Sequence, residues 1–134
     1  MKRIAVVLGL VFAGMSVTTS CDEPTKVQMG ERTTLKVNAV YDAKKIAVGE
    51  VIHAKFTVEN TGDVPLVLSD VKGSCSCTVA DFPTDPIAPG KTGIIKATVD
   101  TKAAPVGHLE KSVRIMANTS PELTVVTVQA TIIR

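Results

Sequence analysis

The chain has 134 residues, enough for one ordinary domain and too few for two. Its formal net charge is +2, and the 113 residues that follow residue 21 carry 13 basic and 13 acidic side chains, so they are neutral. A neutral surface with 3% aromatic residues excludes a nucleic-acid-binding protein, which needs a basic face or a stacking platform, and it lacks the polybasic cluster of a membrane-surface protein.

Residues 1–20 are predicted to be a lipoprotein signal peptide that is removed by cleavage. Lys2 and Arg3 form a charged start, and the apolar run Ile4–Met15 that follows is shorter than the roughly twenty residues needed to span a bilayer. The run leads into Val17-Thr18-Thr19-Ser20-Cys21. This sequence resembles a bacterial lipobox, whose cysteine is acylated, although Thr18 stands where leucine is usual.

Cys21 is therefore the expected lipidation site. The alternative is ordinary signal cleavage, which leaves Cys21 as a free thiol or a disulfide partner. We expect lipidation because Cys75 and Cys77 then remain as an even pair in an oxidising compartment. Residues 21–33 are polar and without periodicity, so they are predicted to be a lipidated, flexible tether. The protein is expected in the cell envelope, held by lipid to the outer membrane on its periplasmic or surface side.

Residues 34–134 are predicted to be an all-β domain, an immunoglobulin-like β-sandwich of about seven strands. β-Branched residues alternate with polar ones, and turn signals recur every eight to twelve residues. Three long strands are expected, each with one inward-facing row of apolar side chains, and three shorter ones. The long strands are Val51–Asn60 (Ile52, Ala54, Phe56 and Val58 inward), Leu109–Ala117 (Leu109, Val113, Ile115 and Ala117 inward, with Lys111 interrupting the row near a strand end) and Leu123–Ile133 (Val126, Val128, Ala130 and Ile132 inward); the shorter ones are Leu35–Val40, Leu66–Val71 and Gly93–Val99.

Turn chemistry separates these strands at Asn60-Thr61-Gly62-Asp63, at Ala88-Pro89-Gly90-Lys91 and at Asn118-Thr119-Ser120-Pro121. The first of these could offer side-chain oxygens to calcium, but a hairpin turn is the more common use of such a segment.

A family resemblance rests on four segments in fixed order: Phe56–Leu66, Val71–Thr78, Pro86–Gly90 and Asn118-Thr119. Together they resemble the bacterial lipoprotein family catalogued as domain of unknown function 1573, over roughly Leu35–Arg134. The resemblance implies an immunoglobulin-like sandwich, similar to those of pilus chaperones and cilium-associated proteins, and a location in the envelope. It implies no activity. The usual family motif is Gly-Ser-Cys-Gly-Cys-Thr, and Ser76 replaces its second glycine here.

Cys75 and Cys77 are the residues with the strongest indication of chemistry. In an extended segment their side chains share one face at a spacing of about 6.5–7 Å, so a direct disulfide requires a kink. Two thiolates on one face could instead bind copper or zinc, with His53, His108 and Met116 as weak additional ligands. A structural role, metal binding and thiol–disulfide exchange all stay open at this stage.

The sequence contains no arrangement typical of a catalytic site, so a non-enzymatic binding or structural protein is expected, without a cofactor. Its expected partners are the membrane, through the lipid, and a protein or other envelope component. Binding of copper or zinc through Cys75 and Cys77 is the alternative function, and thiol–disulfide exchange the third. The sequence does not predict the oligomeric state.

Overall fold

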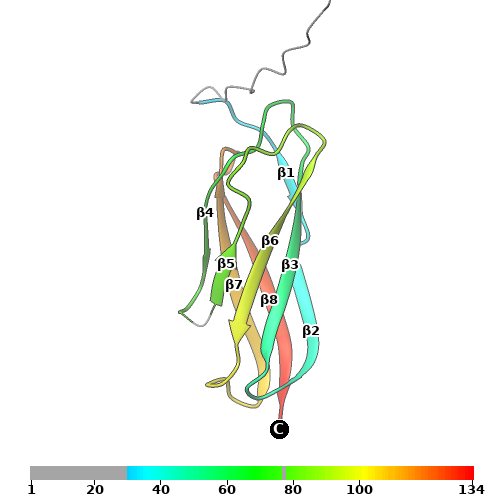
Figure 1. Cartoon of the computed structure of the whole chain (residues 1–134), viewed down its shortest axis with the longest axis vertical. Helices are drawn as coiled ribbons and strands as arrows, with labels where there is room; N and C mark the ends of the chain where they lie inside the picture. The colour runs from blue at the N-terminus through cyan, green and yellow to red at the C-terminus, as the bar shows by residue number, and fades with distance from the viewer. Residues whose placement is uncertain (1–29, 77) are drawn as a thin grey trace, which may run out of the picture.

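The computed structural model describes residues 30–76 and 78–134; the predicted signal peptide, Cys21, most of the predicted tether and Cys77 lie outside these described residues. The described chain forms two four-stranded β-sheets that pack face to face (Figure 1), which confirms the predicted all-β sandwich. One sheet has the strand order β1-β3-β6-β5 and the other β2-β8-β7-β4. In this part of the chain no helix is long and apolar enough to cross a membrane. The strands are β1 (Leu35–Val37), β2 (Val40–Ala47), β3 (Val51–Asn60), β4 (Leu68–Gly73), β5 (Thr78–Asp81), β6 (Thr92–Asp100), β7 (Gly107–Ala117) and β8 (Leu123–Ile133).

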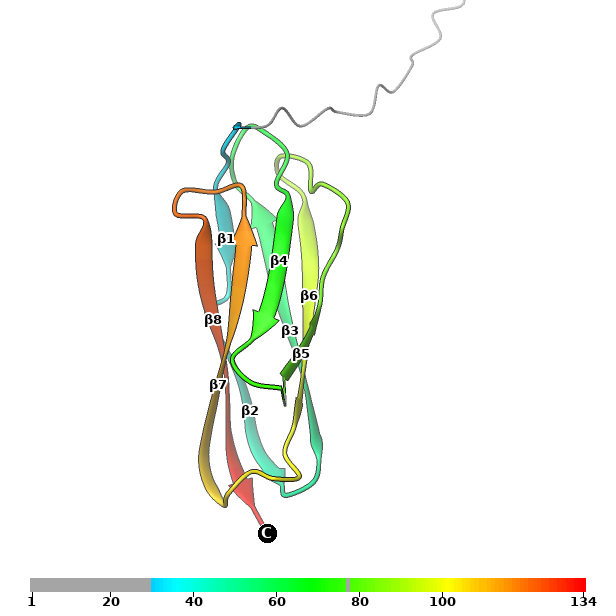
Figure 2. The same cartoon turned by 90° about the vertical axis from the view of Figure 1, so that its left-hand side faces the viewer.

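The described residues form eight strands, and the predicted strand Leu35–Val40 is shorter than expected: β1 ends at Val37, and Val40 begins β2 in the other sheet. β1 runs antiparallel to the end of β3, with Leu35 opposite Asn60. After Asn38 the chain crosses to the other sheet, where β2 runs parallel to β8. Figure 2 shows the result: β1 lies at the level of the upper half of β8 and β2 at the level of its lower half.

β2 contains a bulge that hides its pattern in the sequence. Its register with β8 shifts between Asp42 and Lys45, and Lys44 adopts a left-handed conformation with φ of 63°. Asp42 accepts hydrogen bonds from the Lys44 ammonium at 2.8 Å and from the Lys44 backbone N–H at 2.9 Å. These hydrogen bonds, the ammonium first, lower the pKa of the exposed Asp42 carboxyl below its ordinary value.

The core lies between the sheets and is made by the predicted inward rows. All twelve side chains expected to face inward from the three long strands are buried. At the margin of the core, Tyr41 of β2 meets Phe56 of β3 edge to face, with ring centroids 6.3 Å apart. This contact joins the two sheets along the side where the chain crosses between them.

Lys111 is not near a strand end, as the sequence suggested, but in the middle of β7. It is opposite Val128 on the inward row and is half-buried. β4 pairs with β7 only as far as Val113, so this side of the sandwich is open below that point. A small cavity of about 210 Å³, lined by Lys111, Leu109 and the loop after β6, lies there. A lysine is tolerated because its stem packs in this opening while its ammonium can reach water.

Candidate functional site

Cys75 lies in the short segment that carries the chain from β4 in one sheet to β5 in the other. Ser74 fixes the start of this segment to β7: its N–H donates to the Ser112 carbonyl at 2.8 Å, and its hydroxyl accepts from the Ser112 N–H at 3.3 Å. The Thr78 N–H donates to the Cys75 carbonyl at 3.1 Å, which closes a four-residue turn. The cysteine segment is therefore a tight turn attached to both sheets.

Gly73 is needed at the entrance to this turn. A Cβ atom at position 73 would overlap the side chain and the carbonyl oxygen of Thr78. The last residue of β4 and the first residue of β5 thus approach more closely than any side chain at position 73 would permit. The glycine of the cysteine motif therefore has a packing role.

The Cys75 sulfur is part of a disulfide, and its partner lies outside the described residues. The Cys75 side chain is half-buried, and its Sγ is 3.7 Å from the Thr78 hydroxyl oxygen. Soft metal ions bind cysteine as the thiolate, so a sulfur held in a disulfide is not available as a ligand. In this state the described part of the segment offers no free thiolate.

The three proposed additional ligands are not gathered around Cys75. His108 and Met116 lie on β7, each four residues from Ser112, which is about 13 Å along a strand. His53 lies on the exposed face of β3, opposite Thr98 and in the other sheet. Within residues 30–76 and 78–134, no group of three histidine, cysteine or acidic side chains could hold a metal ion.

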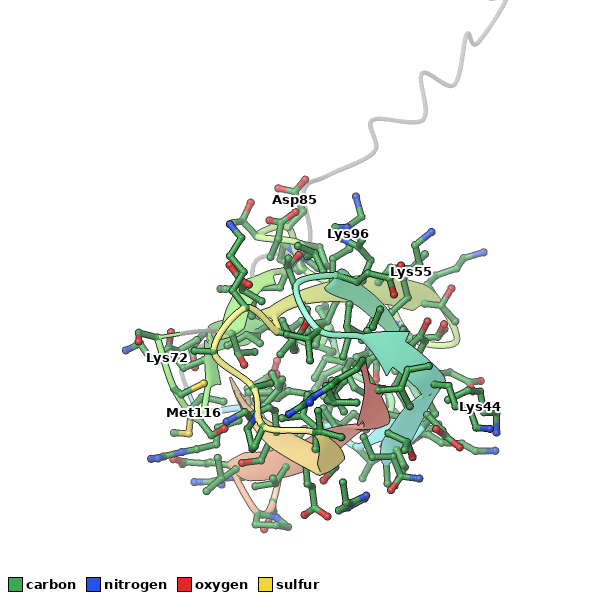
Figure 3. All side chains as sticks on the ribbon, turned by 90° about the horizontal axis from the view of Figure 1, so that it is seen from below. Lys44, Lys55, Lys72, Asp85, Lys96 and Met116 are labelled. Carbon is green, nitrogen blue, oxygen red and sulfur yellow. The ribbon has the colours of Figure 1, made fainter. Side chains whose placement is uncertain are left out.

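Two charged side chains discussed for this region are in ion pairs. The Lys72 ammonium lies 2.9 Å from the Asp70 carboxylate. The His108 Nε2 atom is 3.6 Å from the Glu110 carboxylate. Figure 3 shows Lys72 and Met116 pointing outward from one sheet, whereas Lys55 and Lys96 point outward from the other.

The segment that begins at Asn60 connects the two sheets, so the predicted hairpin turn is wrong. Asn60 is fully buried at the end of β3. Its amide nitrogen donates to the carbonyls of Val64 and Ile87, both at 2.8 Å. Its oxygen accepts from the Thr33 hydroxyl at 2.8 Å and from the Gly62 N–H at 3.1 Å. All four hydrogen-bonding positions are used, so Asn60 holds the connection in place and offers nothing to calcium.

Asn118 holds the same connection from the opposite sheet. Its oxygen accepts from the Val67 N–H at 2.7 Å, and its amide nitrogen donates to the Pro65 carbonyl at 3.0 Å. Between these two attachments Leu66 is fully buried and pairs with Ile87. From the sequence, both asparagines were expected only as turn residues. The readable signal was at Asn60, which continues the inward-facing row of β3.

Residues 33–132 match the family described as protein of unknown function (DUF1573). The chain belongs to this family. The match starts at Thr33, the buried residue whose N–H donates to the Asn118 carbonyl and whose hydroxyl reaches Asn60, so the family boundary coincides with the first fixed residue of the sandwich. No curated protein matches the chain in sequence.

Solved structures share the fold of this family member at low sequence identity. A protein of unknown function from Porphyromonas gingivalis superposes with a TM-score of 0.67 at 21% identity, covering 78% of this chain and 49% of that one. The ASH/PapD-like domain 7 of human CEP192 gives 0.60 at 10% identity, covering 90% and 98%. The secreted serine protease VesC from Vibrio cholerae gives 0.58 at 11% identity, covering 77% and 24%. The chain thus spans about half of the first of these proteins and about a quarter of the third. These similarities establish the fold alone.

Proposed function

We propose that this family member is a non-enzymatic module of the cell envelope, anchored by lipid at Cys21, that binds a protein or other envelope component. The observation that supports binding is the crossing of the chain from one sheet to the other between β1 and β2, which leaves part of β3 and part of β8 without a neighbouring strand on one side. Exposed strand edges take up extended segments of partner proteins by main-chain hydrogen bonding. The proposed mode requires no cofactor.

The position of the proposed anchor suits such a module. Cys21 precedes Gly30 by nine residues, which can span at most about 30 Å. The described chain starts at one end of the sandwich and finishes at the other (Figure 1). A lipid on Cys21 would hold the first end near the membrane and direct the opposite end outward. Exposed Val48, Val51 and Val106 belong to that outer end.

The experiment is photo-crosslinking of the full chain in intact cells, followed by membrane extraction and mass spectrometry. We expect a diacylated Cys21 and one recurrent cross-linked partner. The matched variant Cys21→Ser should lose the lipid mass and leave the membrane fraction while keeping the fold. An unmodified Cys21 in the wild-type chain would overturn the anchor, and cross-links no more specific than those of an unrelated lipoprotein would overturn the binding function.

A second candidate function is thiol–disulfide exchange, or metal binding after reduction, and the half-buried Cys75 disulfide favours it. A structural disulfide resists the glutathione pool, whereas an exchange site has a higher reduction potential, above about −300 mV. Redox titration of the full chain decides between these roles. Copper(I) or zinc added to the reduced chain, with Cys75→Ser as control, tests the metal. A potential below this range, with no metal binding beyond that of the variant, would leave the cysteine a structural role.

A further inference from the structure

Because the chain crosses to the other sheet after β1, part of one edge of β8 has no neighbouring strand among the described residues. We call this part the open half-edge of β8. β2 accompanies β8 only from Thr127 to Ile133, although β8 already begins at Leu123. Above Thr127 the neighbouring position in the sheet is empty of any described strand. β1 stands across this gap but belongs to the other sheet, where it pairs with β3. Figure 2 shows β1 at the level of the upper part of β8.

The backbone of β8 directs hydrogen-bonding groups into this gap. The Thr127 N–H donates to the Ala39 carbonyl at 2.8 Å, so Thr127 faces the β2 side of the strand. Alternate residues of a strand point their N–H and C=O groups to the same side. Val125 and Leu123 therefore present theirs to the open half-edge. Among the described residues, none bonds to these groups.

β1 forms the opposite wall of the gap, and it too has backbone groups that do not face its neighbouring strand. The Thr34 carbonyl accepts from the Thr61 N–H, so Thr34 faces β3, and by alternation Leu35 and Val37 turn their backbone groups away from β3. Their side chains are half-buried and pack against the core. The two walls enclose a groove of about 400 Å³. We call it the β1/β8 groove; its apolar lining consists of Leu35, Val37, Ala39, Pro121 and Val125.

Two further observations indicate which kind of segment would fit the β1/β8 groove. Val125, on the rim, is 50% exposed, which is high for a valine within a strand. Lys36 is the single charged side chain that lines the groove, and no ion pair involves it in the part of the chain that the structure describes. An occupant must be extended to reach the backbone groups, apolar at alternate positions to cover the lining, and acidic near Lys36.

The other half-edge left by the crossing, along the first half of β3, is a poorer candidate. There the Thr57 N–H already donates to the side-chain oxygen of Asn38 at 3.1 Å. The adjoining hollow is lined mainly by polar and charged residues, including Lys55 and Glu59. An apolar strand would gain little there, since it would cover charged groups that prefer water.

We propose that the β1/β8 groove accepts a short extended segment of a partner protein, which adds a strand to β8 beside Leu123 and Val125. The segment carries apolar side chains at alternate positions and one acidic residue that faces Lys36. It engages about four residues, or about 13 Å, of β8. This inference rests on the proposed binding function and specifies the site and the chemistry of the partner.

The test uses the full, isotope-labelled chain in detergent micelles and a synthetic eight-residue peptide that alternates valine with threonine and has one central aspartate. Hydrogen exchange followed by NMR should slow at the Leu123 and Val125 amides when the peptide is added. An analogue methylated at the alternate backbone nitrogens that would face β8 keeps every side chain but cannot donate hydrogen bonds to β8, and it should bind at least about tenfold more weakly. Equal binding of both peptides would overturn strand addition.

The site is tested with the variants Val125→Lys and Ile94→Lys. Both wild-type side chains are 50% exposed in strands, but Ile94 lies on β6 in the other sheet. We expect Val125→Lys to weaken peptide binding at least about tenfold and Ile94→Lys to leave it within about twofold. Equal binding to both variants, or protection along β3 instead, would overturn the proposal.

Two results without peptide would also overturn it. Protection of Val125 that increases with protein concentration would identify a second copy as the occupant. Protection that disappears when residues 22–29 are replaced by a glycine–serine stretch would identify the chain's own N-terminal segment. If cross-linking in cells captures the same partner with wild type and Val125→Lys, the binding function stands and the β1/β8 groove is not its site.

Discussion

The replacement Asn60→Ala tests whether the buried asparagine, more than the turn sequence around it, fixes the connection between the two sheets. It removes an amide whose four hydrogen bonds link Thr33, Gly62, Val64 and Ile87. The alanine methyl restores none of them. The side chain is fully buried, so its lost contacts are not replaced by water as readily as at the surface.

The size of the loss in the free energy of unfolding depends on the hydrogen-bonding groups that Asn60→Ala leaves without a partner. A hydrogen bond contributes about 1 kcal/mol net, which gives about 4 kcal/mol for four bonds. The Ile87 carbonyl keeps a second bond, from the Leu66 N–H at 2.8 Å, so its loss costs less. The expected decrease in the free energy of unfolding is therefore about 2–4 kcal/mol, or roughly 10–20 °C in melting temperature.

The assay is urea unfolding followed by circular dichroism, with linear extrapolation to water. Asn38→Ala is the matched control, because Asn38 is exposed and makes one side-chain hydrogen bond, to the Thr57 N–H. We expect the control to lose less than about 1 kcal/mol. A loss at Asn60→Ala no larger than at the control would refute the reasoning.

The variant Asn60→Asp tests the two hydrogen bonds that the Asn60 amide nitrogen donates without changing the size of the side chain. It keeps both acceptor bonds but turns an oxygen toward the Val64 and Ile87 carbonyls in place of the donating nitrogen. Burial and these carbonyls raise the pKa of the new carboxyl above its ordinary value of about 4. The folded state then binds more protons than the unfolded state, so stability is highest below the ordinary pKa and falls as the pH rises through the raised one. A variant whose stability relative to wild type did not fall with pH would contradict the assigned contacts.

Three further changes have defined outcomes. Thr101→Val removes a fully buried hydroxyl that ties the β2–β3 turn, and urea unfolding should show a loss of about 1–2 kcal/mol; an unchanged midpoint would contradict the contact. Gly73→Ala forces a Cβ atom against the side chain and the carbonyl oxygen of Thr78 and should cost about 1–3 kcal/mol in thermal unfolding; an unchanged melting temperature would contradict the overlap. Asp42 should titrate by NMR below its ordinary pKa, and Lys44→Gly, which suits the left-handed backbone, should bring the pKa back up. Asp42 therefore contributes stability above its ordinary pKa that is lost as the pH falls through the lowered one, and an unchanged titration in the Lys44 variant would refute the pairing.

The inward rows of the three long strands were predictable because burial on one face imposes a two-residue period. Ile52, Val113 and Val128 show that period in the sequence and are buried in the structure. What the period cannot specify is which strand lies next to which. Nothing in Leu35–Val40 indicates that the chain changes sheet after Val37, because that depends on contacts made with residues more than twenty positions away.

Two strands were missed for local reasons. β2 loses its alternation at the bulge around Lys44, so its exposed and half-buried residues follow no simple period. β5 has four residues, too few to display a period, and it is defined by its pairing with β6. In both cases pairing with a neighbouring strand makes the segment a strand, and the β-propensity of its own residues is secondary.

The residues of the candidate site could be identified from the sequence, but their arrangement in space could not. The cysteine segment was identified from the spacing of its cysteines and was considered as an extended segment, whereas Cys75 lies in a tight turn. The distance of His108 and Met116 from it follows from the register between β4 and β7, which the sequence does not encode locally. The role of Asn60 and Asn118 in holding the connection between the sheets was not predicted, because an asparagine at the end of a strand is usually a surface turn residue.

The fixed start of the domain and the β1/β8 groove are parts of one structure. Thr33 is held by Asn60 from one sheet and by the Asn118 carbonyl from the other, and Arg32 bonds to the Thr119 carbonyl and to Glu122. These contacts set where β1 stands, and so they set the width of the groove that opens directly beyond them. A chain anchored at Cys21 would place this end nearest the lipid, so a strand bound in the groove would lie beside the membrane and not at the outer end. The segment proposed as a tether and the segment that forms one wall of the groove are therefore continuous in sequence, and loss of the Asn60 contacts should weaken peptide binding as well as stability.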